Sequence, residues 1–228
     1  MTQLHIINSA RAAFVTAVIV TLVASFAFLV LEPQVSRAVT SGPFTISQTI
    51  DGEISFLVDA ANVTMDGSIN GLTGGNATGT TFAVVQTNSA TGYIMQISFE
   101  NQGSSMIGNS TSNQGIRDYS NTGEPTLNFT ASSAALFAYT VNASTTSDLD
   151  DSFLDNGVSC NQPAGGFTAN TCWRGPTTAN FQVIDRGISA PTGATTTLQF
   201  LVNVPNAPVP ALDSDVYTAT ATLTANNQ

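Results

Sequence analysis

The sequence contains no lysine, and its only histidine, His5, lies close to the N-terminus. Five arginines are present, and only Arg117, Arg174 and Arg186 follow residue 38. Acidic residues number 15, so the formal net charge is −10 at pH 7. Because nucleic-acid binding depends on basic side chains that neutralise phosphates, this composition argues against a nucleic-acid partner.

The same absences restrict catalysis. Beyond residue 38 the chain has no imidazole to activate a serine or cysteine nucleophile, no imidazole metal ligand and no lysine for a Schiff base. A pair of carboxylates, as glycosidases use, is the arrangement that remains. No motif pairs two of the acidic residues, and we therefore expect a protein that is not an enzyme.

Charge is also missing from residues 12–31, "AAFVTAVIVTLVASFAFLVL", which are long enough to cross a bilayer as a helix. Arg11 directly precedes them, as in an export signal, and Ser36 and Ala38 are small residues that suit a cut after Ala38. Two interpretations of residues 1–38 stay open, a signal peptide that is removed and an uncleaved N-terminal membrane anchor. Both place residues 39–228, as one domain, outside the cytoplasm in an extracellular or cell-surface location. Membrane contact is expected only through residues 12–31.

The exported region is rich in alternation between apolar and polar residues. In "VYTATATLTA", residues 216–225, the odd positions from Tyr217 to Ala225 are apolar or aromatic, and threonines occupy the even positions that follow Val216. The same period of two recurs in "PFTISQTI", "EISFLV", "GYIMQISFE" and "TTTLQFLVNVP". A period of two is typical of half-buried strands.

Weaker strand candidates are "ANVTM", "TTFAVVQT", "TLNFT", "LFAYTV" and "NFQVI". Clusters of glycine, proline, asparagine and serine separate the candidates, and no amphipathic helix lies among them. We therefore expect an all-β fold, an antiparallel β-sandwich of Ig-like or jelly-roll-like type with about nine or ten strands. One N-terminal hydrophobic helix precedes it.

The two cysteines, Cys160 and Cys172, predict a disulfide, because the chain is exported and the pair is close in sequence. A metal or redox thiol pair is the rival interpretation, but no histidine accompanies the cysteines and the spacing is not C-x-x-C. Trp173 follows directly. Two interpretations of its indole stay open, a stacking platform for a sugar or a protein partner and packing against the disulfide or the core.

Four aspartates, Asp148, Asp150, Asp151 and Asp155, crowd into "SDLDDSFLDNG". Oxygen ligands in a short loop suit Ca²⁺, but the spacing departs from that of an EF-hand loop. A calcium site and a solvated acidic loop are the two interpretations. No other cofactor is expected.

Several segments together, "SGPFTISQTIDGEISFLV", "TNSATGYIMQIS", "ATTTLQFLVNVP" and "DVYTATATLTA", resemble an uncharacterised family of exported β-sandwich surface proteins of candidate-phylum bacteria. The resemblance covers most of residues 41–225. More loosely, the C-terminal pattern is similar to the ends of WxL-type cell-wall domains and of camelysin/TasA-like fibre proteins. This chain departs from them, because Arg174 and Gly175 follow Trp173 and because Asp215–Val216 replaces the usual glycine before the closing tyrosine. These relatives imply a surface or matrix role without catalysis and transfer no site residues.

Two classes of function follow. The first is a secreted or cell-surface structural protein that assembles into fibres or a coat with itself. A cut after Ala38 would free residues 39–50 as a strand-competent arm that adds to an open sheet edge of a neighbour. The alternative is an adhesin-like module, held by an uncleaved anchor, that recognises glycans or other surface proteins. Its contacts would come from Trp173, the loop 103–125 and the acidic loop.

Overall fold

The structure is a computed structural model that describes residues 2–30, 42–111, 114–120, 125–129 and 133–228. The chain divides into two compact units, Met1–Thr49 and Ile50–Gln228. The first unit contains one helix, and the second contains all of the strands found in the described residues.

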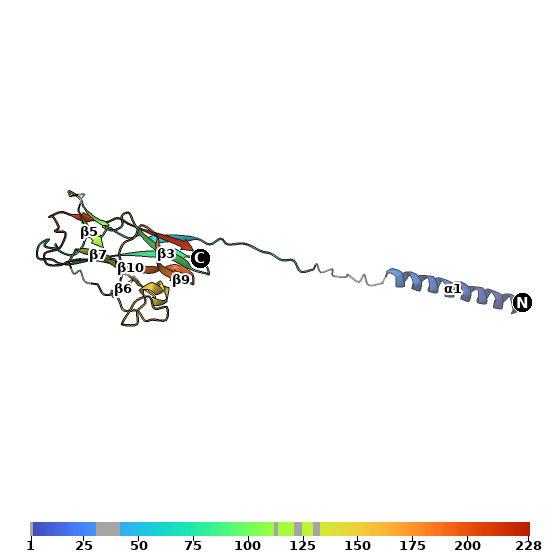
Figure 1. Ribbon diagram of the computed structural model, residues 1–228. Coiled ribbons are helices and arrows are strands. Elements are labelled where there is room, and N and C mark those ends of the chain that lie inside the picture. The colour runs from blue at the N-terminus through green and yellow to red at the C-terminus, as the bar shows by residue number, and fades with distance from the viewer. Residues whose placement is uncertain (1, 31–41, 112–113, 121–124, 130–132) are drawn as a thin grey trace. The chain divides into compact units, whose positions relative to one another are not determined.

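The helix of the first unit is α1, Thr2–Val30, shown in Figure 1. Its segment Ala10–Val30 has a mean hydropathy of 2.6 and is long and apolar enough to cross a membrane. The side chains of this segment are exposed within the unit, and a helix that is apolar on all sides is typical of a membrane span. The predicted N-terminal hydrophobic helix is therefore confirmed. The expected cleavage residues Ser36 and Ala38 lie outside the described residues.

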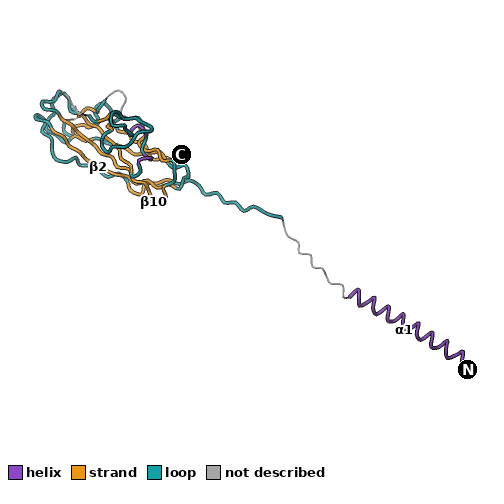
Figure 2. The backbone as a smooth tube through the Cα atoms, turned by 90° about the horizontal axis from the view of Figure 1, so that it is seen from below, coloured by secondary structure: helices purple, strands orange, loops and turns teal. Residues whose placement is uncertain are grey.

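The largest sheet of the second unit has seven strands in the order β1-β2-β10-β7-β5-β4-β11. These are β1 (Ile54–Val58), β2 (Gly75–Thr87), β10 (Ala190–Val204), β7 (Leu136–Ala143), β5 (Gly115–Asp118), β4 (Met106–Gly108) and β11 (Tyr217–Thr218). The two longest strands, β2 and β10, pair antiparallel from the register Ala190↔Thr87 to Val204↔Gly75. Figure 2 shows them side by side.

A second sheet has three strands in the order β12-β3-β9, namely Ala221–Asn227, Tyr93–Phe99 and Phe181–Arg186. The last strand of the chain, β12, pairs with β3 along its whole length, from Ala221↔Phe99 to Asn227↔Tyr93. A short ribbon joins β6 (Thr126–Leu127) to β8 (Cys172–Trp173). Two single-turn 3₁₀ helices, η1 (Thr146–Asp148) and η2 (Asp151–Phe153), lie between β7 and β8.

One hydrophobic core serves both larger sheets. In β3 the alternate residues Tyr93, Met95, Ile97 and Phe99 are at most 4% exposed. The ring of Phe99 contacts two aromatic residues of β7 in the other sheet, Phe137 and Tyr139, with ring centroids 6.2 Å and 5.5 Å apart. Burial of such side chains stabilises the fold by roughly 1.5–3 kcal/mol each.

The fold is all-β beyond α1, as predicted, but the expectation of antiparallel sheets is wrong for one of them. β5 runs parallel to β7, with Arg117 opposite Leu136 and Asp118 opposite Phe137, so the seven-stranded sheet is mixed. Two parallel strands that are neighbours in a sheet need a connection that returns to the same end of the sheet. Residues 119–135, between β5 and β7, are long enough for this connection. The loop expected over 103–125 also contains β4 and β5.

The strand predicted at residues 43–50 is also wrong for the single chain. These residues have the right alternation, but they form neither helix nor strand. Their apolar side chains are largely exposed to solvent: Phe44 is 79% exposed, and Ile46 and Ile50 are each 84% exposed. A strand needs a neighbour for its backbone groups, and none of the described residues pairs with this segment in a sheet.

Candidate functional site

The uncharged segment before β1, residues 42–50, is called the arm here. Each residue of the arm is exposed. The chain that follows is held in place by Asn88, whose Oδ1 accepts from the amide of Glu53 at 2.6 Å and whose Nδ2 donates to the carbonyl of Asp51 at 3.1 Å. The hydroxyl of Thr87 donates to the carbonyl of Glu53 at 2.7 Å. Residues 51–53 therefore form a fixed root at the end of β2.

An open cleft of about 640 Å³ lies between the two larger sheets. One wall is residues 59–65, which follow β1, and the opposite wall is residues 216–223, which include β11 and the start of β12. The floor is apolar and comes from β3, β4, β7 and β10, through Ile97, Phe99, Met106, Phe137, Leu198 and Phe200. The cleft thus reaches the edge of the core, where each floor side chain except Phe200 is at most 8% exposed.

The cleft is open because no strand of the described residues joins the two sheets on this side. β1 pairs only with β2, and β12 pairs only with β3, so both are edge strands. At one end β12 contacts the last residue of β2, the neighbour of β1, where Oγ1 of Thr87 lies 2.6 Å from Oδ1 of Asn227. Away from this contact, Phe56, Tyr217 and Leu223 line the cleft and are only partly buried.

Residues 61–65 of the first wall were one of the weaker strand candidates. The wall at residues 59–65 forms no strand. It lies along β2, where the amide of Ala61 donates to Oγ1 of Thr81 at 2.9 Å. Gly79 of β2 allows this approach, since a Cβ there would lie 2.4 Å from Cγ1 of Val63. A glycine inside a strand often marks such a close approach, and this signal was present in the sequence.

The opposite wall is fixed at its start by Asp215. Its Oδ2 accepts from the amides of Ser110 and Thr111 and from the hydroxyl of Thr111, each at 2.8 Å, and its Oδ1 accepts from the amide of Val216. Partial desolvation raises the pKa of Asp215, but these hydrogen bonds outweigh it and lower the pKa to about 2. No local pattern indicates this role, because Ser110 and Thr111 lie 105 and 104 residues away from Asp215 in the chain.

The predicted disulfide between Cys160 and Cys172 is confirmed. Asp155, which precedes the disulfide loop in sequence, is 3% exposed, and its carboxylate accepts from the amides of Gly157 and Thr168 at 2.9 Å and 2.8 Å. Desolvation raises the pKa of Asp155, but these bonds and those from the hydroxyls of Thr168 and Thr171 outweigh it, so the pKa lies below its ordinary value. Asp155 therefore organises the disulfide loop.

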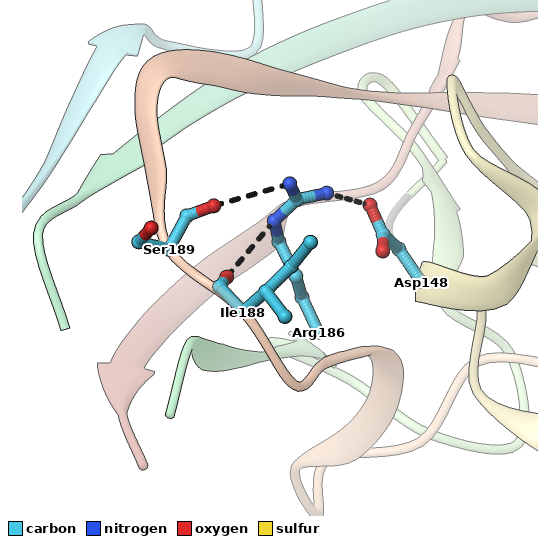
Figure 3. A network of polar contacts seen from close by, with 4 residues as sticks. All are labelled: Asp148, Arg186, Ile188 and Ser189. Atoms are coloured by element: carbon cyan, nitrogen blue, oxygen red, sulfur yellow. Dashed lines mark hydrogen bonds and ion pairs between the residues drawn. The ribbon is translucent and has the colours of Figure 1, made fainter. Parts of the chain in front are cut away.

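Two other aspartates of the acidic segment also have protein partners. Asp148 forms an ion pair with Arg186, whose guanidinium also donates to the carbonyls of Ile188 and Ser189 at 3.1 Å and 3.2 Å (Figure 3). Asp150 caps η2 by accepting from the amide of Ser152 at 3.0 Å.

The structure does not bring the four aspartates together as a metal site. No group of three or more His, Cys, Asp or Glu side chains within the described residues is placed to hold a metal ion. Asp148 faces a guanidinium and Asp155 faces amides and hydroxyls, whereas Asp151 is exposed. The calcium interpretation therefore gains no support from Asp148, Asp150, Asp151 and Asp155.

Trp173 lies in β8 and is 5% exposed. Its Nε1 donates to the carbonyl of Asn170 at 3.1 Å, and its ring meets the ring of Phe129 edge-on, with centroids 5.6 Å apart. Both the disulfide partner Cys172 and Trp173 are buried in the same short strand. This position gives the indole no free face on which a sugar would stack.

Comparison with known proteins adds no family to this geometry. A scan against models of protein families finds no match to the chain. A search of curated proteins finds no significant match either. The arm, the edge strands and the cleft are the features of the described residues that bear on function.

Proposed function

We propose that this protein is a non-catalytic structural protein of the cell surface, whose copies assemble into a fibre or coat by strand addition. The observation that carries the proposal is the arm. It alternates apolar and polar residues as a strand does, yet Phe44, Ile46 and Ile50 are at least 79% exposed. A large exposed apolar segment in a soluble domain marks a surface that another molecule covers.

The free energy of assembly has two sources. Burial of each large apolar side chain of the arm stabilises a complex by roughly 1.5–3 kcal/mol. Backbone hydrogen bonds to an edge strand add directionality. Edge strands that avoid association often have a lysine on the open edge, and this chain has no lysine at all. The two larger sheets have four edge strands among the described residues, β1 and β11 in one and β12 and β9 in the other, and we propose that β1 or β12 accepts the added strand.

The finer architecture belongs to the same proposal. We infer that the seven-stranded and three-stranded sheets form the two layers of a β-sandwich. The shared core and the contacts of Phe99 with Phe137 and Tyr139 support this arrangement. A sandwich with one open side has room for an added strand, whereas a closed barrel does not.

Location outside the cytoplasm fits the same role. The apolar helix α1 and the disulfide are both compatible with export, because disulfides persist in oxidising compartments. A cut after Ala38 would leave the arm close to a new N-terminus, and an uncleaved anchor would tether it to the membrane. In both cases residues 39–228 are exported. The resemblance to exported surface proteins stays a prediction of the sequence.

The experiment is to export the full chain from a bacterial host and to examine the surface fraction by negative stain and sedimentation. We expect polymers from the wild type and their loss in Ile46→Asp, because a carboxylate on the apolar face of the arm resists burial. Thr45→Asp places the same charge on the opposite face and serves as the matched control. A wild type that stays monomeric at high concentration would contradict the proposal.

The alternative function, an adhesin-like module that binds glycans or other surface proteins, has weaker support. The side chain expected to stack on a sugar, Trp173, is buried. Part of the loop expected to contact a partner, 103–125, lies outside the described residues. None of the described contacts favours a glycan over a protein.

A further inference from the structure

We infer that the cleft between residues 59–65 and 216–223 is the acceptor for the arm of a second copy of this chain. In this complex Phe44–Ile50 lies as an added strand beside β12, with its apolar face on the floor of the cleft. This inference rests on the proposed function and identifies the binding site that strand addition requires.

The chemistry of the two surfaces matches. The arm presents Phe44, Ile46 and Ile50 on one face, with Gln48 as the polar member of that row. The floor of the cleft presents large apolar side chains, and its volume of about 640 Å³ is typical of clefts that bury sizeable ligands. The wall at 59–65 adds Asn62 and Thr64, which offer Gln48 hydrogen-bonding groups. The arm has no charged residue, so it brings no ion into the cleft, where Asp59 is the one charged lining residue.

The backbone favours β12 as the neighbour of the added strand. β12 is seven residues long and pairs on one side only, with β3, so half of its backbone groups face away from the sheet. Phe44–Ile50 has the same length. The other wall, residues 59–65, is not a strand and offers no regular ladder. The arm therefore extends the three-stranded sheet to four.

The root of the arm favours a second copy over the chain's own cleft. A Cβ at Gly52 would lie 3.4 Å from Nδ2 of Asn227, so the root sits beside the end of β12. To occupy its own cleft, the chain would have to reverse at residues 51–53. The bonds of Asn88 to Asp51 and Glu53 hold this backbone in its present course. Donation to a second copy keeps them and repeats head to tail, which gives an open polymer.

Cysteine cross-linking tests the contact in the full, exported chain, where both native cysteines are already paired. One tagged copy has Ile46→Cys in the arm. A second copy with a different tag has Ala219→Cys, Ala221→Cys or Leu223→Cys along the wall of the cleft. We expect a disulfide-linked dimer that contains both tags for at least one of these three partners. Thr45→Cys, on the opposite face of the arm, should give a severalfold lower yield with the same partner.

The outcomes separate the binding site from the proposed function. Wild-type polymers without any Ile46→Cys cross-link overturn the acceptor cleft and leave the proposed function standing. A wild type without polymers overturns the proposed function itself. A chain that contains both Ile46→Cys and the best wall cysteine should give a ladder on a non-reducing gel. A monomer closed by its own new disulfide would assign the cleft to the chain's own arm and overturn the second copy as occupant.

Discussion

Single polar side chains connect distant parts of the second unit. Asp215 joins the segment at Ser110 and Thr111 to the wall of the cleft, and Asn88 holds the root of the arm. Both act mainly on backbone amides and carbonyls, which otherwise lack ladder partners in irregular segments. The position of the cleft wall therefore depends on a carboxylate that stays ionised.

Asp215 makes stability depend on pH in a predictable direction. Its pKa falls from an ordinary value of 3.8 to about 2 in the folded chain. The stabilisation is complete above pH 3.8 and is lost as the pH falls through 2, because the unfolded chain binds the proton first. We expect Asp215→Ala to lower the free energy of unfolding at pH 7 and to have progressively less effect between pH 4 and pH 2.

Urea unfolding of the exported protein at pH 7, 4 and 2.5 measures this difference. Asp213→Ala, two residues away, removes the same type of charge and serves as the control. A loss of stability in Asp215→Ala that stays constant down to pH 2.5 would show that the carboxylate is not the group responsible.

At the scale of elements, the segment between η2 and β8 has little regular structure and depends on cross-links. The disulfide closes a loop whose ends are 12 residues apart, and Asp155, which precedes the loop, accepts a hydrogen bond from Thr168 in it. On the chain-entropy model, closing a loop of this length stabilises a protein by about 3 kcal/mol.

We therefore expect the double substitution Cys160→Ser and Cys172→Ser to lower the free energy of unfolding by about 3 kcal/mol. Thermal unfolding followed by circular dichroism measures it, and reduction of the wild type should reproduce it. Assembly should persist at temperatures where the variant is folded, because the disulfide does not line the cleft. Loss of polymers from a fully folded variant would link the disulfide loop to assembly.

At the scale of the whole molecule, copies of a chain with a net charge of −10 repel one another. The proposed contact is apolar and uncharged on the side of the arm, so salt screens the repulsion without weakening the contact. We expect the concentration needed for polymerisation to fall as ionic strength rises from about 10 mM to about 150 mM, where the Debye length shortens to about 8 Å.

Light scattering at a series of protein and salt concentrations measures this dependence. The Ile46→Asp variant is the negative control, because it should not assemble at any of these concentrations. If added salt instead dissolves the polymers, the interface contains complementary charges that the uncharged arm does not supply.

Local sequence patterns were enough to predict helix α1 and several of the strands. The period of two in "GYIMQISFE" and "TTTLQFLVNVP" predicted β3 and β10, because alternate side chains of a strand face one core. The uncharged run before residue 31 predicted the helix, and two nearby cysteines in a chain expected to be exported predicted the disulfide. β4 and β5 escaped prediction because both are short and lie in a segment rich in glycine, serine and asparagine.

The neighbours of each strand, by contrast, depend on contacts that no local pattern encodes. The parallel pairing of β5 with β7, the burial of Trp173 and the contact of Thr87 with Asn227, 140 residues apart, all arise from packing of the assembled core. The same holds for the cleft, since an open side appears only when strand order leaves β1 and β12 as edges. Alternation is a property of each segment, whereas an unpaired edge is a property of the complete sheet.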